Sequence, residues 1–385
     1  MLKRINQLEA CAALALLVAC GSTRKVPAPQ PTTARYEPVS WSKLPGWQAD
    51  DALAAWPAVV ASCSVIHARP EWQPFCAAVV AASPGDAAFV RAFLQQHLTP
   101  YRVVRLTGRK RSTTGLITGY YEPLLMGARE RSDEFNTPLY RRPGELLVVD
   151  LSAVIPELKG KRVRGRLDGN KVVPFYSRAQ SREAKGLEGL EIVWVNSALD
   201  AFLLEVQGSG RVQLTTGETI RLQYEDQNGH PYRSIGRYLV DQGAMTLEQS
   251  NMPAIRAWLA ANPQRLREVL DSNPSVVFFR GAPLEDPAVG PKGALGVPLT
   301  AERSIAVDPA VIPLGAPVFL ATIYPATNAP LQRLVAAQDT GGAIRGPVRA
   351  DLFFGFGNTA GEKAGVMKHD GQMWLLWPKG APPPN

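Results

Sequence analysis

The chain alternates between helical and strand-like segments, and this order is the strongest constraint on its fold. Residues 50–98 carry the spacing of amphipathic helices, whereas from about residue 101 short strand-like runs alternate with turns. Helical spacing returns at 246–272, and strand-like runs follow it. The chain has 33 prolines, against roughly 19 expected at an average usage of about 5%, which favours short strands over a helical bundle. The order predicts a mainly β protein with helices (α+β), in which a β-rich segment is inserted between two parts of another domain.

The first twenty residues indicate export from the cytoplasm. Two basic residues precede an apolar run that is too short for a permanent membrane-spanning helix of roughly 20 apolar residues. The run ends in Leu-Val-Ala-Cys at 17–20, which is typical of a bacterial lipobox, and Gly21 follows instead of an aspartate that favours the inner membrane. We therefore expect a lipoprotein signal peptide at 1–19 and lipidation of Cys20, with the protein anchored in the outer membrane and facing the periplasm. A plain signal peptide with a chance cysteine is the alternative.

A second terminal feature is the stretch at 20–40, where prolines and threonines are typical of a flexible tether.

The formal net charge of +8 suits nucleic acid, anionic lipid or the carboxylates of cell-wall peptide stems as a binding partner. Export argues against nucleic acid as a partner.

Two cysteines remain for the folded part once Cys11 leaves with the signal and Cys20 is lipidated. Cys63 and Cys76 either form a disulfide, which an oxidising periplasm permits, or stay as two buried free thiols. The four histidines show no metal-ligand spacing, so we expect neither a metal nor a cofactor.

Three aspartates beside strand-like sequence are the candidate catalytic groups. Asp339 opens Asp-Thr-Gly-Gly, whose amides would keep the carboxylate ionised and lower its pKa. Asp351 precedes Leu-Phe-Phe-Gly-Phe-Gly, and this apolar surface would raise its pKa so that it holds a proton near neutrality. Asp308 completes the set. The alternative for each is that the side chain satisfies turn amides.

The Asp-Thr-Gly sequence at 339–341 also raises the possibility of an aspartic-type protease. Such enzymes need two carboxylates that share a proton, and the chain has no second Asp-Thr-Gly or Asp-Ser-Gly, so a protease would require a dimer. A non-catalytic peptidoglycan-binding lipoprotein of the outer membrane is the competing interpretation without enzymatic activity.

Five separated segments together resemble the membrane-bound lytic murein transglycosylase A family. They are Thr-Gly-Tyr-Tyr-Glu-Pro at 118–123, Val-Gln-Gly-Ser-Gly at 206–210, Asn-Pro-Ser-Val-Val-Phe-Phe-Arg at 273–280, Asp-Thr-Gly-Gly-Ala-Ile-Arg-Gly at 339–346 and Asp-Leu-Phe-Phe-Gly-Phe-Gly at 351–357. The resemblance implies a large catalytic domain built on a double-psi β-barrel at 41–120 and 235–380. It also implies an inserted, smaller β-barrel domain at 121–234, with a glycan groove between the two.

The resemblance further implies an activity and a site. The expected reaction cleaves the β-1,4 bond between N-acetylmuramic acid and N-acetylglucosamine and forms 1,6-anhydro ends, with Asp351 as general acid and then base. Asp339 and Asp308 are the expected supporting acids, and Asp339 is the second candidate for the catalytic role. Expected partners are the glycan strands of peptidoglycan, the membrane through the lipid anchor, and cell-wall synthesis or division proteins. The candidate substrate-binding residues are Thr118, Tyr120, Tyr121, Gln207, Ser209, Gly341 and Gly342.

Overall fold

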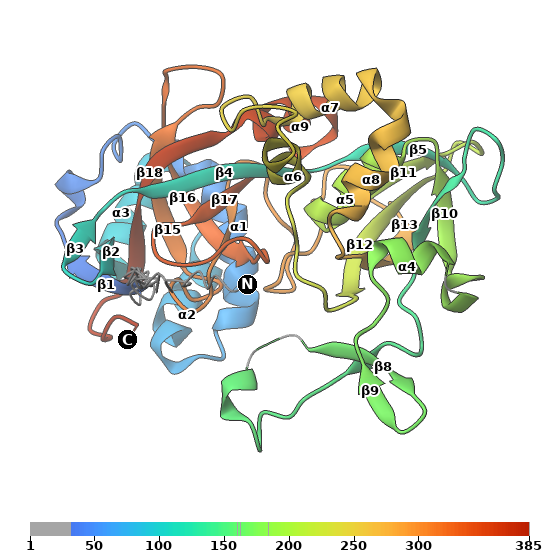
Figure 1. Ribbon diagram of the computed structural model, residues 1–385. Helices are drawn as coiled ribbons and strands as arrows, with labels where there is room; N and C mark the ends of the chain where they lie inside the picture. The colour runs from blue at the N-terminus through green and yellow to red at the C-terminus, as the bar shows by residue number, and fades with distance from the viewer. Residues whose placement is uncertain (1–31, 160, 162, 184, 385) are drawn as a thin grey trace, which may run out of the picture. The chain divides into compact units, whose positions relative to one another are not determined.

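The computed structural model describes residues 32–159, 161, 163–183 and 185–384 (Figure 1). The predicted signal peptide, Cys20 and the first part of the tether lie outside these residues. Within them, strands and helices both occur throughout, which confirms the predicted α+β class. No helix of this described part is long and apolar enough to cross a membrane.

The largest sheet has nine strands drawn from the two ends of the described chain. Its strands are β1 (Thr32–Pro38), β2 (Leu98–Thr107), β3 (Lys110–Ser112), β4 (Gly115–Glu122), β14 (Ser304–Val307), β15 (Pro317–Ile323), β16 (Pro330–Asp339), β17 (Ala350–Phe356) and β18 (Lys368–Pro378).

Six of these strands close into a ring. β18 pairs with β15 and with β4, and the path from β15 through β16, β14 and β17 returns to β4. Two of the pairings, β14 with β16 and β17 with β4, are parallel, and the others are antiparallel. Closure leaves no free edge among the six strands. Side chains from five of them, Ile117, Ile305, Val335, Leu352 and Leu375, are fully buried in one apolar core. The predicted barrel is thus present.

Three helices pack on this core, as the spacing over 50–98 predicts. They are α1 (Trp56–Ile66), α2 (Gln73–Ala81) and α3 (Ala87–His97). Cys63 of α1 and Cys76 of α2 form a disulfide with a Cα–Cα distance of 5.2 Å. Trp72, just before α2, packs edge-on against Trp377 of β18, with ring centroids 5.2 Å apart. The disulfide therefore joins two helices that cover the apolar core.

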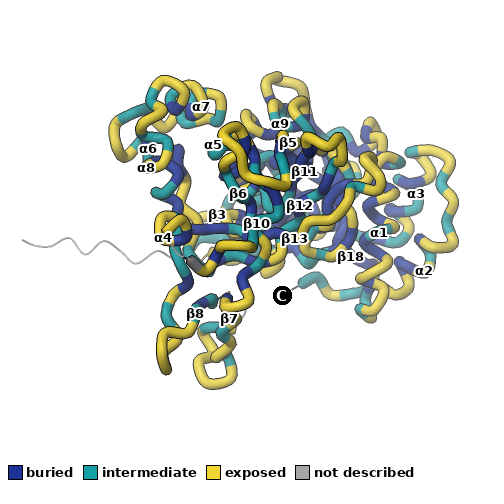
Figure 2. The backbone as a smooth tube through the Cα atoms, turned by 90° about the vertical axis from the view of Figure 1, so that its right-hand side faces the viewer, coloured by how far each residue is buried: buried dark blue, intermediate teal, exposed yellow. Residues whose placement is uncertain are grey.

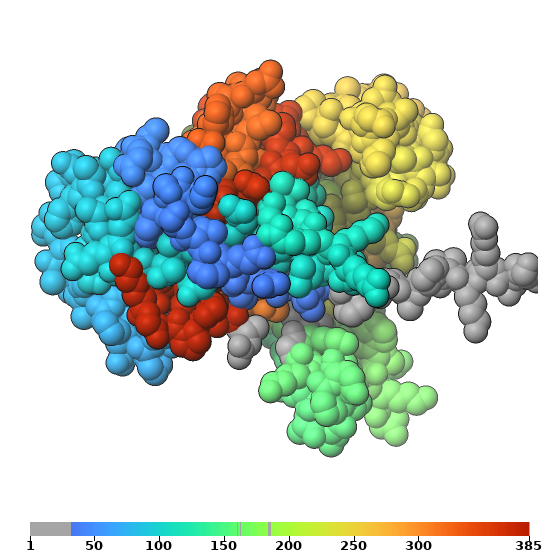
Figure 3. All heavy atoms as spheres, turned by 90° about the vertical axis from the view of Figure 1, so that its left-hand side faces the viewer, coloured from blue at the N-terminus to red at the C-terminus, as the bar shows by residue number. Residues whose placement is uncertain are grey.

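The predicted tether is wrong from residue 32 onwards. β1 pairs with β2 along its whole length, from Thr32 opposite Thr107 to Pro38 opposite Tyr101. The hydroxyl of Tyr36 also donates a hydrogen bond to the carbonyl of Val311. The composition of this stretch alone favours a tether. The strand forms only because β2 offers it an edge to pair with, and the sequence of the stretch does not reveal that partner. Figure 3 shows this N-terminal segment (blue) beside the C-terminal segment (red) on one face.

A second sheet has six strands in the order β13-β12-β11-β5-β10-β6. They are β5 (Leu124–Ala128), β6 (Thr137–Tyr140), β10 (Glu191–Val195), β11 (Ser209–Leu214), β12 (Thr219–Gln227) and β13 (Val277–Pro283). The edge strands β6 and β13 lie close together, so the sheet curves back on itself. β13 follows residue 234 in the sequence and nevertheless belongs to this sheet. A three-stranded sheet, β7 (Leu147–Val148), β8 (Arg164–Asp168) and β9 (Lys171–Val173), is largely exposed (Figure 2).

The remaining helices are α4 (Arg178–Glu183), α5 (Ala198–Gln207), α6 (Ile235–Asp241), α7 (Met252–Ala261), α8 (Leu266–Asp271) and α9 (Gly357–Val366). α5 begins at Ser197, whose hydroxyl accepts a hydrogen bond from the Asp200 amide. It ends at Gly208, whose positive φ of 82° is easily adopted by glycine. This end positions Gln207 and the first residue of β11.

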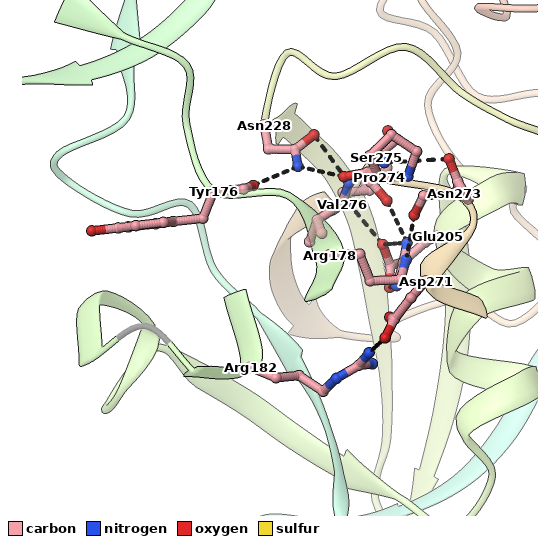
Figure 4. A network of polar contacts seen from close by, with 11 residues as sticks. Tyr176, Arg178, Arg182, Glu205, Asn228, Asp271, Asn273, Pro274, Ser275 and Val276 are labelled. Atoms are coloured by element: carbon pink, nitrogen blue, oxygen red, sulfur yellow. Dashed lines mark hydrogen bonds and ion pairs between the residues drawn. The ribbon is translucent and has the colours of Figure 1, made fainter. Parts of the chain in front are cut away.

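The segment 273–276 is fixed by polar contacts to three other parts of the chain (Figure 4). The amide of Asn228 donates to the Tyr176 and Pro274 carbonyls at 2.8 and 2.9 Å, and its oxygen accepts from the Val276 amide at 3.1 Å. Arg178 makes two 2.8 Å bonds to Glu205. The Asn-Pro-Ser-Val part of the family motif is therefore a structural joint that leads the chain into β13.

Candidate active site

Two of the three predicted aspartates lie on either side of one residue of the barrel. Ala306 of β14 pairs with Asp339 of β16 on one side and with Asp351 of β17 on the other. Thr118 of β4 pairs with Asp351 in turn. Neighbouring strands are about 4.8 Å apart, and residues at the same level project to the same face of a sheet. Asp339, Asp351 and Thr118 come from three separated segments of the chain, and their side chains lie in one row, which we call the acid row.

Asp351 lies among two polar neighbours in a buried environment. Thr118 Oγ1 donates a 2.6 Å hydrogen bond to Asp351 Oδ1, and Arg349 Nη1 donates to the same Thr118 oxygen at 3.0 Å. Burial is the main cause that raises the pKa of Asp351 to about 6. Thr118 and Arg349 oppose this rise, and the negative charge of Asp339 adds to it. The residue keeps partial exposure, so a ligand can reach it. A raised pKa caused by burial agrees with the interpretation of its apolar surroundings.

Asp339 is held by three donors. The hydroxyl of Tyr120 donates to Oδ2 at 2.9 Å, and the amides of Ala294 and Thr340 donate to Oδ1, each also at 2.9 Å. Burial nevertheless raises the pKa of Asp339, because it outweighs these hydrogen bonds. The prediction that amides of Gly341 and Gly342 lower this pKa is wrong on both counts: the described donors are other residues, and the shift has the opposite sign.

Asp308 serves the loop that follows Asp339. Its carboxylate accepts the Ala310 amide at 3.1 Å and the Gly346 amide at 2.7 Å, and Arg345 lies 3.8 Å away. Gly346 has a positive φ of 86°, so the carboxylate fixes a backbone turn. These contacts match the alternative role of satisfying turn amides.

Three of the candidate substrate-binding residues lie on β4 and divide between its two faces. Thr118 and Tyr120 reach Asp351 and Asp339, as alternate residues of one strand should. Tyr121 points the other way, towards Gly361 of α9, and its amide donates to Gln207 Oε1 at 3.1 Å. Ser209 pairs with Gln223 in the second sheet, and none of its described contacts reaches an aspartate.

Two contributors were missed in the sequence. Arg349 interacts with Asp351 and lies two residues before it, an alternation that could have indicated a shared face. Ala294 contributes only an amide from a loop, and no sequence signal marks it. Among the described residues, no group of three or more His, Cys, Asp or Glu side chains could hold a metal ion.

Comparisons with known proteins place this barrel and its second sheet. Family models described as the MltA specific insert domain and the 3D domain match residues 116–280 and 303–377. The chain is 35% identical over 269 residues to the membrane-bound lytic murein transglycosylase A of Escherichia coli strain K12, which is 67% of this chain and 64% of that relative. The match thus spans slightly less than two thirds of that relative's length.

Solved structures agree over more of the chain. The crystal structure of MltA from Neisseria gonorrhoeae, in its monoclinic form, has a TM-score of 0.78 and 36% identity over 92% of this chain and 96% of that chain. The structure of Escherichia coli MltA with bound chitohexaose has a TM-score of 0.65 and 27% identity over 92% of this chain and 93% of that chain. The chain thus combines a 3D domain with an MltA specific insert domain, and this combination defines its class. The chain belongs to the membrane-bound lytic murein transglycosylase A family.

Proposed function

We propose that the chain is a lytic transglycosylase that cleaves the MurNAc-β-1,4-GlcNAc bond of peptidoglycan and leaves 1,6-anhydroMurNAc ends. The observation that carries the proposal is the position of Asp351, a partly exposed residue beside Thr118 and near Asp339, whose raised pKa of about 6 lets its carboxyl exist in both protonation states near neutrality. The named relatives and the chitohexaose bound to one of them support the substrate class.

One carboxyl suffices for this reaction because the substrate carries its own nucleophile. Protonated Asp351 gives its proton to the glycosidic oxygen as the bond from that oxygen to C1 of the muramyl sugar breaks. The resulting carboxylate then takes the proton of the C6 hydroxyl while the C6 oxygen forms its bond to C1. Ordinary glycosidases need a second carboxyl for water or for an enzyme nucleophile, whereas here the attacking group is already tethered.

Asp339 is proposed to stabilise the positive charge that develops on the sugar. Its hydrogen bonds from Tyr120, Ala294 and Thr340 all favour the ionised form, and protonated Asp351 adds no like charge beside it. Asp308 contributes through the loop that it fixes.

The decisive experiment compares products from purified sacculi digested by the parent and by Asp351→Asn. We expect anhydro-muropeptides from the parent and a fall of at least roughly 10²-fold in the variant, the lower range for general acid catalysis, while sacculus binding persists. Asp339→Asn should lose less, and Asp308→Asn should mainly lose stability. All three are assayed well below their melting temperatures. Near-parental turnover by folded Asp351→Asn would assign the acid to another residue.

The protease alternative is weaker in this geometry. An aspartic protease holds two carboxyls about 3 Å apart so that they share a proton. Asp339 and Asp351 interact electrostatically, but no hydrogen bond between them occurs among the described contacts. Pepstatin-sensitive peptide cleavage, without anhydro-muropeptides, would favour it nonetheless.

We also propose the lipid anchor and the outer-membrane location predicted from residues 17–20, together with an inserted domain and a glycan groove. The membrane-bound designation of the relatives supports an anchor. Cys20→Ala should release the protein from membranes and leave the activity of the soluble chain intact, measured by fractionation and palmitate labelling. Continued labelling and partition into detergent would contradict the lipobox.

A further inference from the structure

A cavity lined by cations lies beside the acid row. Its volume is about 790 Å³, within the roughly 300–1,000 Å³ of ligand pockets. The β2–β3 hairpin forms one wall, and the loop 345–349 with Leu116 of β4 forms another. Five cationic side chains line it, and no acidic residue does: Arg105, Lys110, Arg111, Arg345 and Arg349.

Two of these five charges, those of Arg105 and Lys110, are left for a ligand. Arg105 and Lys110 are exposed and pair with no acidic side chain among the described residues. Arg111 pairs with Glu37 at 2.6 Å, and Arg345 lies 3.8 Å from Asp308. An array of like charges around a concave surface concentrates anions much more strongly than a single exposed pair.

Arg349 connects the cavity to the acid row. This residue lines the cavity and donates to Thr118 Oγ1, which itself donates to Asp351. Leu116 lines the cavity and Thr118 follows it two positions along β4, so both lie on the same face of the strand. The cavity therefore lies next to the row that contains Asp351, with Arg349 between them.

We propose that this cavity binds the carboxylates of the peptide stem attached to the muramyl residue at the cleavage site. The inference rests on the proposed function, because the muramyl sugar that reacts at Asp351 is the one that carries the acidic peptide. An anionic lipid headgroup would also match the charge, but it would not need a cavity next to Asp351.

The test compares strands that keep their stems with strands from which an amidase has removed them. We expect the parent to have a kcat/KM for stem-bearing strands about three- to thirtyfold higher, as for one or two exposed ion pairs. In Arg105→Gln/Lys110→Gln the ratio of kcat/KM for stem-bearing strands to kcat/KM for stem-free strands should fall towards one. Added salt should change this ratio less in the variant than in the parent. The matched control Lys43→Gln/Lys379→Gln removes two exposed charges outside the cavity and should keep the parental ratio.

Two further measurements separate the outcomes. Binding of both kinds of strand to immobilised full-length protein tests the cavity without cleavage, so a parent that binds stems selectively but cleaves nothing contradicts the proposed function alone. A ratio near one in the parent, or an unchanged ratio in Arg105→Gln/Lys110→Gln, overturns the stem proposal. If Arg105→Gln/Lys110→Gln no longer adsorbs to phosphatidylcholine vesicles containing phosphatidylglycerol but keeps the parental kcat/KM ratio, the cavity binds a membrane surface instead.

Discussion

Asp351 lowers the stability of the folded chain near neutral pH, where the residue is proposed to act. Its pKa rises from 3.8 to about 6 on folding, so the folded chain binds this proton more tightly than the unfolded chain does. The group costs no stability below pH 3.8, and its cost grows between pH 3.8 and 6 and is complete above that range.

Asp351→Asn should therefore be more stable than the parent at pH 7, by an amount on the order of 1–3 kcal/mol. The advantage should disappear near pH 4, because the asparagine carries no charge and its oxygen can still accept from Thr118. Urea unfolding at the two pH values measures the difference. An equal effect at pH 4 and pH 7 would show that packing, and not ionisation, is responsible.

At this scale the sequence predicts the environment of Asp351 but not that of Asp339. The apolar run after Asp351 indicates its burial correctly. The glycines after Asp339 suggest a lowered pKa, but the donors come from Tyr120, Ala294 and Thr340, and burial prevails. Burial depends on the neighbouring strands, which local sequence does not contain.

Among the elements, the helices of residues 56–97 follow from their spacing, whereas β1 does not. Helix periodicity is a local signal, but an edge strand forms only when a partner offers its hydrogen-bonding groups. Thr32–Pro38 has such a partner in β2, far along the chain.

The disulfide between α1 and α2 should be a main support of the helical cover. It closes a loop with a sequence separation of 13, for which the expected stabilisation is about 3 kcal/mol. Unfolding in urea with and without a reductant should show a loss of this size. Thiol labelling of the unfolded, unreduced mature protein, in which Cys63 and Cys76 are the only thiols left after lipidation of Cys20, should find almost none free. Two free thiols per mature chain would contradict the pairing.

On the scale of the molecule, β4 connects the two large sheets. It carries Thr118 and Tyr120 in the barrel, and its last residue, Glu122, is fully buried between two arginines of the second sheet. Arg211 Nε lies 2.8 Å and Arg221 Nε 2.7 Å from the Glu122 carboxylate. A buried charge with two partners is costly to leave incomplete.

Glu122→Gln should destabilise the chain by about 3–5 kcal/mol, because two buried guanidinium groups lose their counterion. The matched control Asp241→Asn breaks the exposed pair with Arg237 in α6 and should cost less than about 0.5 kcal/mol. Both values come from denaturant midpoints. Similar small losses in the two variants would mean that this triad does not connect the sheets energetically.

The position of β18 has a consequence for timing. This strand, Lys368–Pro378, pairs with β2, β4 and β15 and closes the ring in which Asp339, Asp351 and Thr118 meet. A chain interrupted just before it would contain every residue proposed for catalysis and still lack the barrel that aligns them. The proposed cleavage of peptidoglycan would therefore begin only after β18 has been synthesised and has closed the ring.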